Sequence, residues 1–189
     1  MSTTRRVLVA GTIALMVSWV ALASAVYASL PEELATHFGP NGVADHFAAK
    51  SIGTWFMLPA VGASTTLLIL GLGALLPSRP GLLNTPAKAE LLALPDRWQR
   101  PLLEEAATMM TGLGLSIAVL FATIHWDTWR VAVTTQRGLS LITWIVMAGS
   151  LGGSTIGMLV WSRRFQYRIL AARDTVVAQE SSATARRAS

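Results

Sequence analysis

The residues of this chain best suited to ligand chemistry are three histidines and their acidic neighbours. His37, Asp45 and His46 stand close together in the segment LPEELATHFGPNGVADHFAAK, which runs from Leu30 to Lys50, and His125 follows much later. Imidazole nitrogen and carboxylate oxygen are ligands that Zn²⁺ accepts. Histidine also titrates close to neutral pH. These residues could therefore serve a metal site or a pH-sensitive binding surface.

Three interpretations of this chemistry stay open. In the first, segment 30–50 is a non-catalytic binding or sensing surface: His37 and Phe38 face a peptide, a lipid headgroup or a partner protein, while Asp45 pairs with Lys50 or caps a turn. The second is a site for Zn²⁺ or a similar ion, with candidate ligands His37, His46, His125 and Asp45, helped by Glu33 or Asp127. In the third, the protein is an accessory subunit of a larger membrane complex and binds no ligand here.

Composition indicates that this segment lies between membrane-spanning helices. Of the 189 residues, 52% are hydrophobic and 13% are charged, about half the usual charged share of a soluble domain. Four stretches without Asp, Glu, Lys or Arg each reach the roughly 20 residues that cross a bilayer: 7–29, 51–76, 106–126 and 139–161. We therefore expect an all-α membrane protein with four transmembrane helices and a compact loop between the first two.

The positive charges predict the orientation. Twelve of the 15 Lys and Arg residues fall at the amino terminus, in loop 77–105 or in the carboxyl tail, and only Lys50, Arg130 and Arg137 fall on the other side. By the positive-inside rule both termini are cytoplasmic and segment 30–50 is extracytoplasmic. The excess of arginine over lysine favours a bacterium, and hence its cytoplasmic membrane. An alternative reading of the first span, ending in ALASAVYA, is a cleaved signal peptide, which leaves the loop outside as well.

The sequence predicts no catalytic machinery. The span interiors lack the ionisable residues of proton relays, and there is no phosphate-binding loop or nucleophile signature. The chain has no cysteine, which removes thiolate chemistry and disulfides. We expect a protein that is not an enzyme and that binds no nucleic acid. We also expect no cofactor, the alternative being a bound metal ion.

Local signals predict the shape of segment 30–50. Ser29 to Glu32 matches a capping box with Pro31 in the first turn, which predicts a short helix through Phe38. The sequence GPNG at residues 39–42 then predicts a chain reversal. The segment is expected to form a compact cap over the helix ends.

The same residues carry a family resemblance. The pattern Pro31, His37-Phe38, Gly42, Asp45 and Lys50, set between two spans, resembles the signature of bacterial membrane proteins with the domain of unknown function 1648 and covers residues 1–60. That domain also occurs in the Sdp toxin immunity protein family, so the resemblance implies self-protection and signalling towards a secreted peptide. The later arginine- and tryptophan-containing motif of the longer immunity proteins is absent, so the resemblance supports the membrane module more than the immunity activity.

The remaining chain is expected to complete the bundle. Residues 61–165 hold the other spans and the cytoplasmic loop 77–105, in which AKAELLAL predicts a short helix. Residues 166–189 form a basic tail that continues the fourth helix and is disordered from about Val177. Gly149, Gly153 and Gly157 form a small-residue stripe. We expect it to pack against the third span, the alternative being a homodimer.

Overall fold

The computed structural model describes residues 1–188 of the chain and has four helical segments long and apolar enough to cross a membrane. They are α1 (Thr3–Val26), α2 (Ile52–Leu75), α4 (Asp96–Val133), and a fourth made of α5 (Leu141–Met147), the π-helical η3 (Ala148–Gly153) and α6 (Ser154–Ala188). Each contains or closely matches one of the apolar stretches of the sequence. The prediction of a four-span, all-α membrane protein is confirmed.

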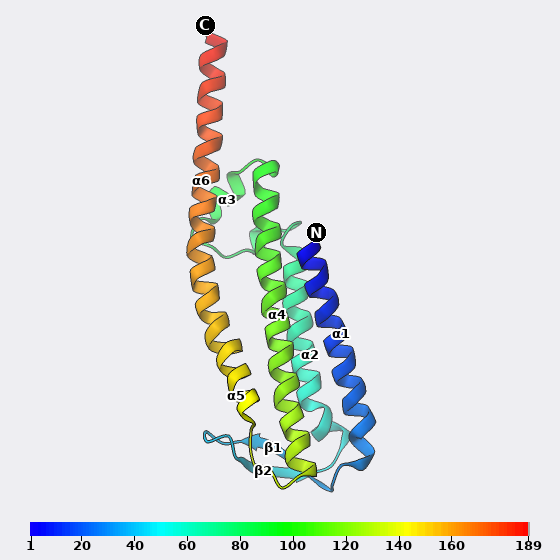
Figure 1. The fold of residues 1–189 in the computed structure, drawn as a ribbon. Coiled ribbons are helices and arrows are strands. Elements are labelled where there is room, and N and C mark those ends of the chain that lie inside the picture. The colour runs from blue at the N-terminus through cyan, green and yellow to red at the C-terminus, as the bar shows by residue number, and fades with distance from the viewer. Residues whose placement is uncertain (189) are drawn as a thin grey trace.

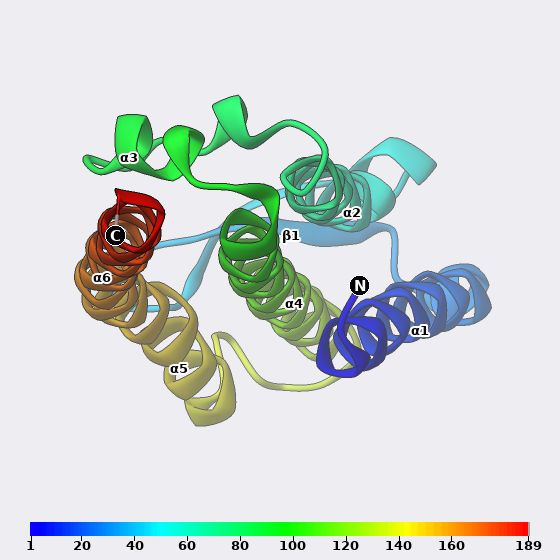
Figure 2. The ribbon, with the colours of Figure 1, turned by 90° about the horizontal axis from the view of Figure 1, so that it is seen from above.

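Helix α4 is the centre of the bundle. It packs against α2 and α1 on one side and against α5 and α6 on the other, as the view along the bundle shows (Figure 2). Both chain termini lie at the same end of the molecule, and the loop between α1 and α2 lies at the opposite end (Figure 1). Segment 30–50 is therefore separated from both termini by the length of the bundle.

The loop between α1 and α2 is a β-hairpin, and the prediction of a short helix through Phe38 is wrong. A 3₁₀ turn, η1 (Tyr27–Ser29), is followed by strand β1 (Glu33–Phe38), which pairs antiparallel with β2 (Ala44–Ala49). The residue before a proline is disfavoured in helical conformation, and Leu30, which precedes Pro31, has extended angles (φ −70°, ψ 148°). The helix that the capping box suggests therefore does not start.

Two apolar clusters hold the ends of the bundle. At the hairpin end, Ala23, Leu30, Leu34 and Trp55 are buried together. At the other end, the loop after α2 forms η2 (Pro80–Leu82) and α3 (Lys88–Ala93), and α3 packs with α4 and α6. The predicted short helix in loop 77–105 is thus present, and it belongs to a core.

The glycine stripe does not pack against the third span. A Cβ added at Gly149, Gly153 or Gly157 would meet nothing within 4 Å among the described residues. The side of α4 that carries Gly114 instead meets Leu70 of α2, whose Cδ2 would lie 3.3 Å from an added Cβ. The expected intramolecular packing of the stripe is therefore wrong. Helix α6 also continues through Ala188, so residues for which the sequence predicts disorder are helical.

Candidate functional site

A tight turn brings the two strands of the hairpin together. The Gly39 N–H donates to Val43 O at 2.9 Å, the Gly42 N–H donates to Gly39 O at 2.8 Å, and Asn41 Oδ1 accepts from the Val43 N–H at 3.0 Å. Gly42 has a φ of 74°, the left-handed region that glycine reaches without steric cost. The GPNG sequence therefore specifies the reversal, as predicted.

The hairpin is fixed across the ends of the helices. The Ala44 N–H donates to Arg137 O at 2.9 Å, and the Leu139 N–H donates to Gly42 O at 2.8 Å, which ties the hairpin tip to the connection between α4 and α5. At its base, the Lys50 N–H donates to Glu32 O at 2.7 Å. Leu34 is almost completely buried, towards Trp55. Because one side is anchored, the opposite side of the hairpin has a defined surface.

Two irregularities in strand pairing gather the polar side chains. Ala35 pairs with Phe47 and His37 with His46, so Thr36 is an extra residue on β1; Phe38 then pairs with Ala44, so Asp45 is an extra residue on β2. Regular strands direct neighbouring side chains to opposite faces, whereas a β-bulge re-aims one of them. Asp45 and His46 consequently both reach His37.

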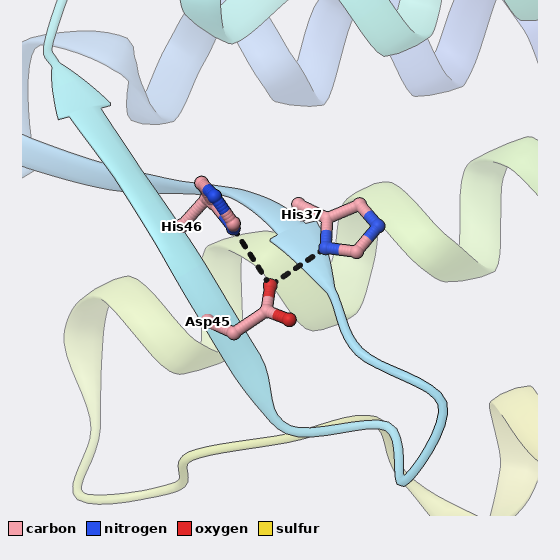
Figure 3. Close-up of side chains that lie close together, drawn as sticks. All are labelled: His37, Asp45 and His46. Atoms are coloured by element: carbon pink, nitrogen blue, oxygen red, sulfur yellow. Dashed lines mark hydrogen bonds and ion pairs between the residues drawn. The ribbon is translucent and has the colours of Figure 1, made fainter.

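His37, Asp45 and His46 form one polar cluster, shown in Figure 3. Asp45 Oδ1 lies 2.6 Å from His37 Nδ1 and 3.2 Å from His46 Nδ1. An ionised carboxylate can only accept hydrogen bonds, so each imidazole donates from Nδ1. These hydrogen bonds, first that of His37 and then that of His46, lower the pKa of Asp45 below its ordinary 3.8. All three side chains are exposed.

The cluster has the ligand atoms of a transition-metal site. One nitrogen from each histidine and one carboxylate oxygen lie within 4.8 Å of one another. Ligands bound to Zn²⁺ at 2.0–2.2 Å in a tetrahedron are about 3.4 Å apart, so a small movement of the rings would bring all three onto one ion. Two nitrogens and one oxygen suit zinc, whereas Ca²⁺ and Mg²⁺ prefer all-oxygen sites.

Lys50 does not pair with Asp45. Its Nζ donates to Leu30 O at 2.8 Å and to Ala28 O at 3.3 Å, and it lies 5.3 Å from the centroid of the Tyr27 ring. The lysine thus satisfies one carbonyl in η1 and one just before the hairpin. Of the two contacts expected for Asp45, the one with Lys50 is not formed, because the bulge directs Asp45 to the histidines.

His125 lies away from the cluster. It is 4% exposed and lies inside the bundle, where its ring meets those of Trp19 and Trp55 at 5.8 and 4.1 Å between centroids. Its candidacy as a hairpin metal ligand is therefore wrong. The other candidates around the cluster lie as follows: Phe38 is half-buried at the end of β1, and Pro31 and Glu33 are exposed.

Asp127, which the sequence offered as an auxiliary metal ligand, lies outside the cluster and is a structural residue. It is fully buried, and its Oδ2 accepts from the Ser140 N–H at 2.7 Å and from Ser140 Oγ at 3.1 Å. Its Oδ1 forms an ion pair with Arg130 Nε at 3.4 Å. The sequence signal for this structural role is Ser140, whose Oγ also accepts from the Thr143 N–H as the cap of α5. Asp127 thereby anchors the loop to which the hairpin tip is joined.

The fold and the site define a multi-pass membrane protein with a hairpin crossing one end of its bundle. Residues 13–63 match the family model described as Domain of unknown function (DUF1648). The matched segment contains the second half of α1, the whole hairpin and the first half of α2. No curated protein and no solved structure matches the chain. The histidine–aspartate cluster thus lies within the matched segment.

Proposed function

We propose that this protein is a non-catalytic binding and sensing protein of the membrane, and that its hairpin binds one divalent metal ion of the zinc class. The observation that carries the proposal is the position of Asp45 Oδ1, which is within hydrogen-bond distance of both His37 Nδ1 and His46 Nδ1. Three ligand groups of the appropriate chemistry are thus already gathered, and a water molecule would complete a tetrahedral site.

The charge of the cluster supports a cation as the ligand. Imidazole binds a metal in its neutral form, so the metal-binding form of the cluster carries the single negative charge of Asp45, whose ion pairs among the described residues are with His37 and His46. A metal ion would replace the Nδ1 protons, so its binding would release protons and weaken at low pH. Because the side chains are exposed, an ion could reach them directly from solution.

The sensing role follows from how the hairpin is anchored. A metal ion would join β1 to β2 beside the turn, and the turn is hydrogen-bonded to the loop between α4 and α5. A more ordered hairpin would therefore restrict the movement of the ends of all four spans. We place the hairpin outside the cytoplasm, because most of the Lys and Arg residues lie at the opposite end of the bundle and positive charge is typical of the cytoplasmic side.

The test is the metal content of the purified protein. The protein, with an affinity tag that contains no histidine, is dialysed against trace Zn²⁺ and analysed by elemental mass spectrometry. We expect about one retained ion per chain, and its loss in His37→Ala, His46→Ala and Asp45→Asn. Glu33→Gln is the matched control, because Glu33 is an exposed carboxylate on the same hairpin and does not belong to the group of ligand atoms. Absence of a retained ion in the wild type would refute the metal site.

Peptide recognition is a second candidate function. Its support is the family match together with Phe47 and Val43, two exposed apolar side chains on the hairpin that also carries the cluster. The resemblance to immunity proteins implies a secreted peptide as the ligand. Cells lacking the gene should then be sensitive to such a peptide, and Phe47→Ser should fail to protect them while His46→Ala protects. Equal protection by both variants would count against a peptide surface on the hairpin.

A further inference from the structure

A cavity of about 430 Å³ lies between α1, α2 and α4, in the half of the bundle next to the hairpin. Such a volume is typical of small-molecule sites. Four of the chain's seven tryptophans line it, and none of its lining residues is Asp, Glu, Lys or Arg. Its wall is formed mainly by Trp19, Trp55, Trp126, Trp129, His125 and Leu15. The cavity therefore suits an uncharged, largely apolar molecule.

His125 supplies a hydrogen-bond donor in this wall. Trp19 Nε1 donates to His125 Nδ1 at 2.8 Å. An indole nitrogen can only donate, so Nδ1 is the accepting nitrogen of the ring and the proton of the neutral imidazole is on Nε2. That Nε2 is buried and makes no hydrogen bond of ordinary geometry within residues 1–188. A buried donor without a partner is unfavourable unless a ligand or water accepts from it.

A backbone acceptor lies beside this donor. Residue 59 is a proline within α2, and proline has no N–H with which to donate to the carbonyl four residues earlier. That carbonyl belongs to Trp55, and it faces the His125 ring. The wall of the cavity thus presents the Nε2 donor and, next to it, a carbonyl that lacks the partner it would have four residues further along a regular helix.

One functional group satisfies both atoms. A hydroxyl accepts from the Nε2–H and donates to the Trp55 carbonyl, whereas an ether or ketone oxygen satisfies only the donor and a hydrocarbon neither. We propose that the cavity binds an apolar alcohol, with its hydroxyl between His125 Nε2 and the Trp55 carbonyl and its hydrocarbon body against the tryptophans. This site is distinct from the metal cluster on the hairpin and does not depend on it.

The ligand enters from the bilayer. Leu22 and Trp126 line the cavity and are among the exposed large apolar residues, at 64% and 54%. They lie on α1 and α4, and both positions belong to membrane-spanning segments. The mouth of the cavity is thus a gap between these two helices that faces lipid. An apolar alcohol dissolved in the membrane reaches it without crossing water.

The experiment uses tryptophan fluorescence, because most of the chain's indoles are at the site. The protein is reconstituted into nanodiscs of saturated phospholipid and titrated with a brominated long-chain alcohol, and separately with the same brominated alkane lacking the hydroxyl. Bromine quenches indoles that it contacts. We expect saturable quenching by the alcohol. The apparent affinity for the alkane should be lower than that for the alcohol by about tenfold or more, because the alkane leaves both polar atoms unpaired.

Three variants separate the possible causes. His125→Phe should abolish the preference for the alcohol. Ala122→Phe, which fills the cavity from its wall, should remove saturable quenching by both compounds while zinc retention stays as in the wild type. Trp144→Phe, outside the cavity, is the control and should bind like the wild type.

Several outcomes would overturn the proposal. Equal affinity for the alcohol and the alkane would show that a lipid acyl chain occupies the cavity. Quenching that persists in the Ala122→Phe variant would show that binding occurs elsewhere. Retention of the alcohol preference in His125→Phe would remove the hydroxyl assignment. If His125→Phe does not fold, comparison of the two compounds on the wild type and on Ala122→Phe still decides the matter.

Discussion

Trp19 and His125, which are 106 residues apart in sequence, are joined by a hydrogen bond of 2.8 Å between indole Nε1 and imidazole Nδ1 inside the bundle. This bond links α1 to α4 at a depth where neither side chain meets bulk water. The His125 ring lies against Trp55 of α2 as well. One histidine thus connects three of the four spans.

Substitution of Trp19 by phenylalanine should destabilise the bundle. The change leaves His125 Nδ1 unpaired while retaining an aromatic ring, and we expect a loss of about 1–2 kcal/mol, a range that allows for the modest strength of hydrogen bonds between membrane helices. Equilibrium unfolding of the reconstituted protein in SDS would measure it. Trp126→Phe, at an exposed neighbouring position, should change stability by less than about 0.5 kcal/mol. Equal stability of the two variants would contradict this role for Trp19.

Two glycine substitutions should have opposite consequences. In Gly42→Ala the new Cβ would lie 2.8 Å from Trp144 Cζ2 on a backbone with φ of 74°, so we expect a loss of about 1–3 kcal/mol. Gly149→Ala meets nothing within 4 Å among the described residues and should be neutral or stabilising by up to about 1 kcal/mol. The same SDS unfolding assay compares them. A destabilised Gly149→Ala would point to a helix partner in the membrane.

The titration of Asp45 should depend on His37. A carboxylate with a lowered pKa stabilises the folded hairpin at pH values above its ordinary 3.8, and this stabilisation is lost as the pH falls through the lowered pKa. In metal-free His37→Ala the pKa of Asp45 should rise back towards 3.8, because the largest cause of the shift is gone, and His46→Ala should raise it less. Carboxyl ¹³C NMR measures both. An unchanged pKa in His37→Ala would refute the hydrogen bond in solution.

Cysteine labelling should report the orientation of the bundle. The chain has no cysteine, so Asn41→Cys in the hairpin turn and Asn84→Cys in loop 77–105 each provide a single exposed thiol. We expect a membrane-impermeant maleimide to label intact cells at position 41 and to label position 84 only after lysis. The reverse pattern would place the hairpin in the cytoplasm and would exclude recognition of an external ligand.

The spans were predictable because a single physical requirement determines them. A helix that crosses a bilayer needs about 20 apolar residues without charge, and stretches 7–29 and 51–76 satisfy this locally. The turn at residues 39–42 was also predictable from a local requirement. Residue 42 has a positive φ, which glycine adopts without strain. These features depend on few distant residues.

The hairpin and its cluster depend on distant residues. Capping signals at Ser29 favour a helix, but Leu30, which precedes Pro31, is extended. Residues 33–38 instead pair with β2 as a strand. The bulges that turn Asp45 towards His37 have no marker in the sequence, so a contact between Asp45 and Lys50 was an equally reasonable expectation. The position of His125 depends on how α4 packs against α1, which the spacing of residues within one helix does not reveal.

The fourth span has a mechanical consequence. The π-helical segment η3 lies between α5, whose start is held by Asp127, and α6, which extends alone beyond the bundle (Figure 1). A π-helix differs from an α-helix by one residue in its hydrogen-bond register. A slip of one residue within η3 would therefore rotate everything beyond it by about 100° and shift it by about 1.5 Å along the axis. Helix α6 is about 50 Å long by the same rise per residue. If it moved as a rigid body, the far end of the helix would rotate with it, on the side of the membrane opposite the hairpin.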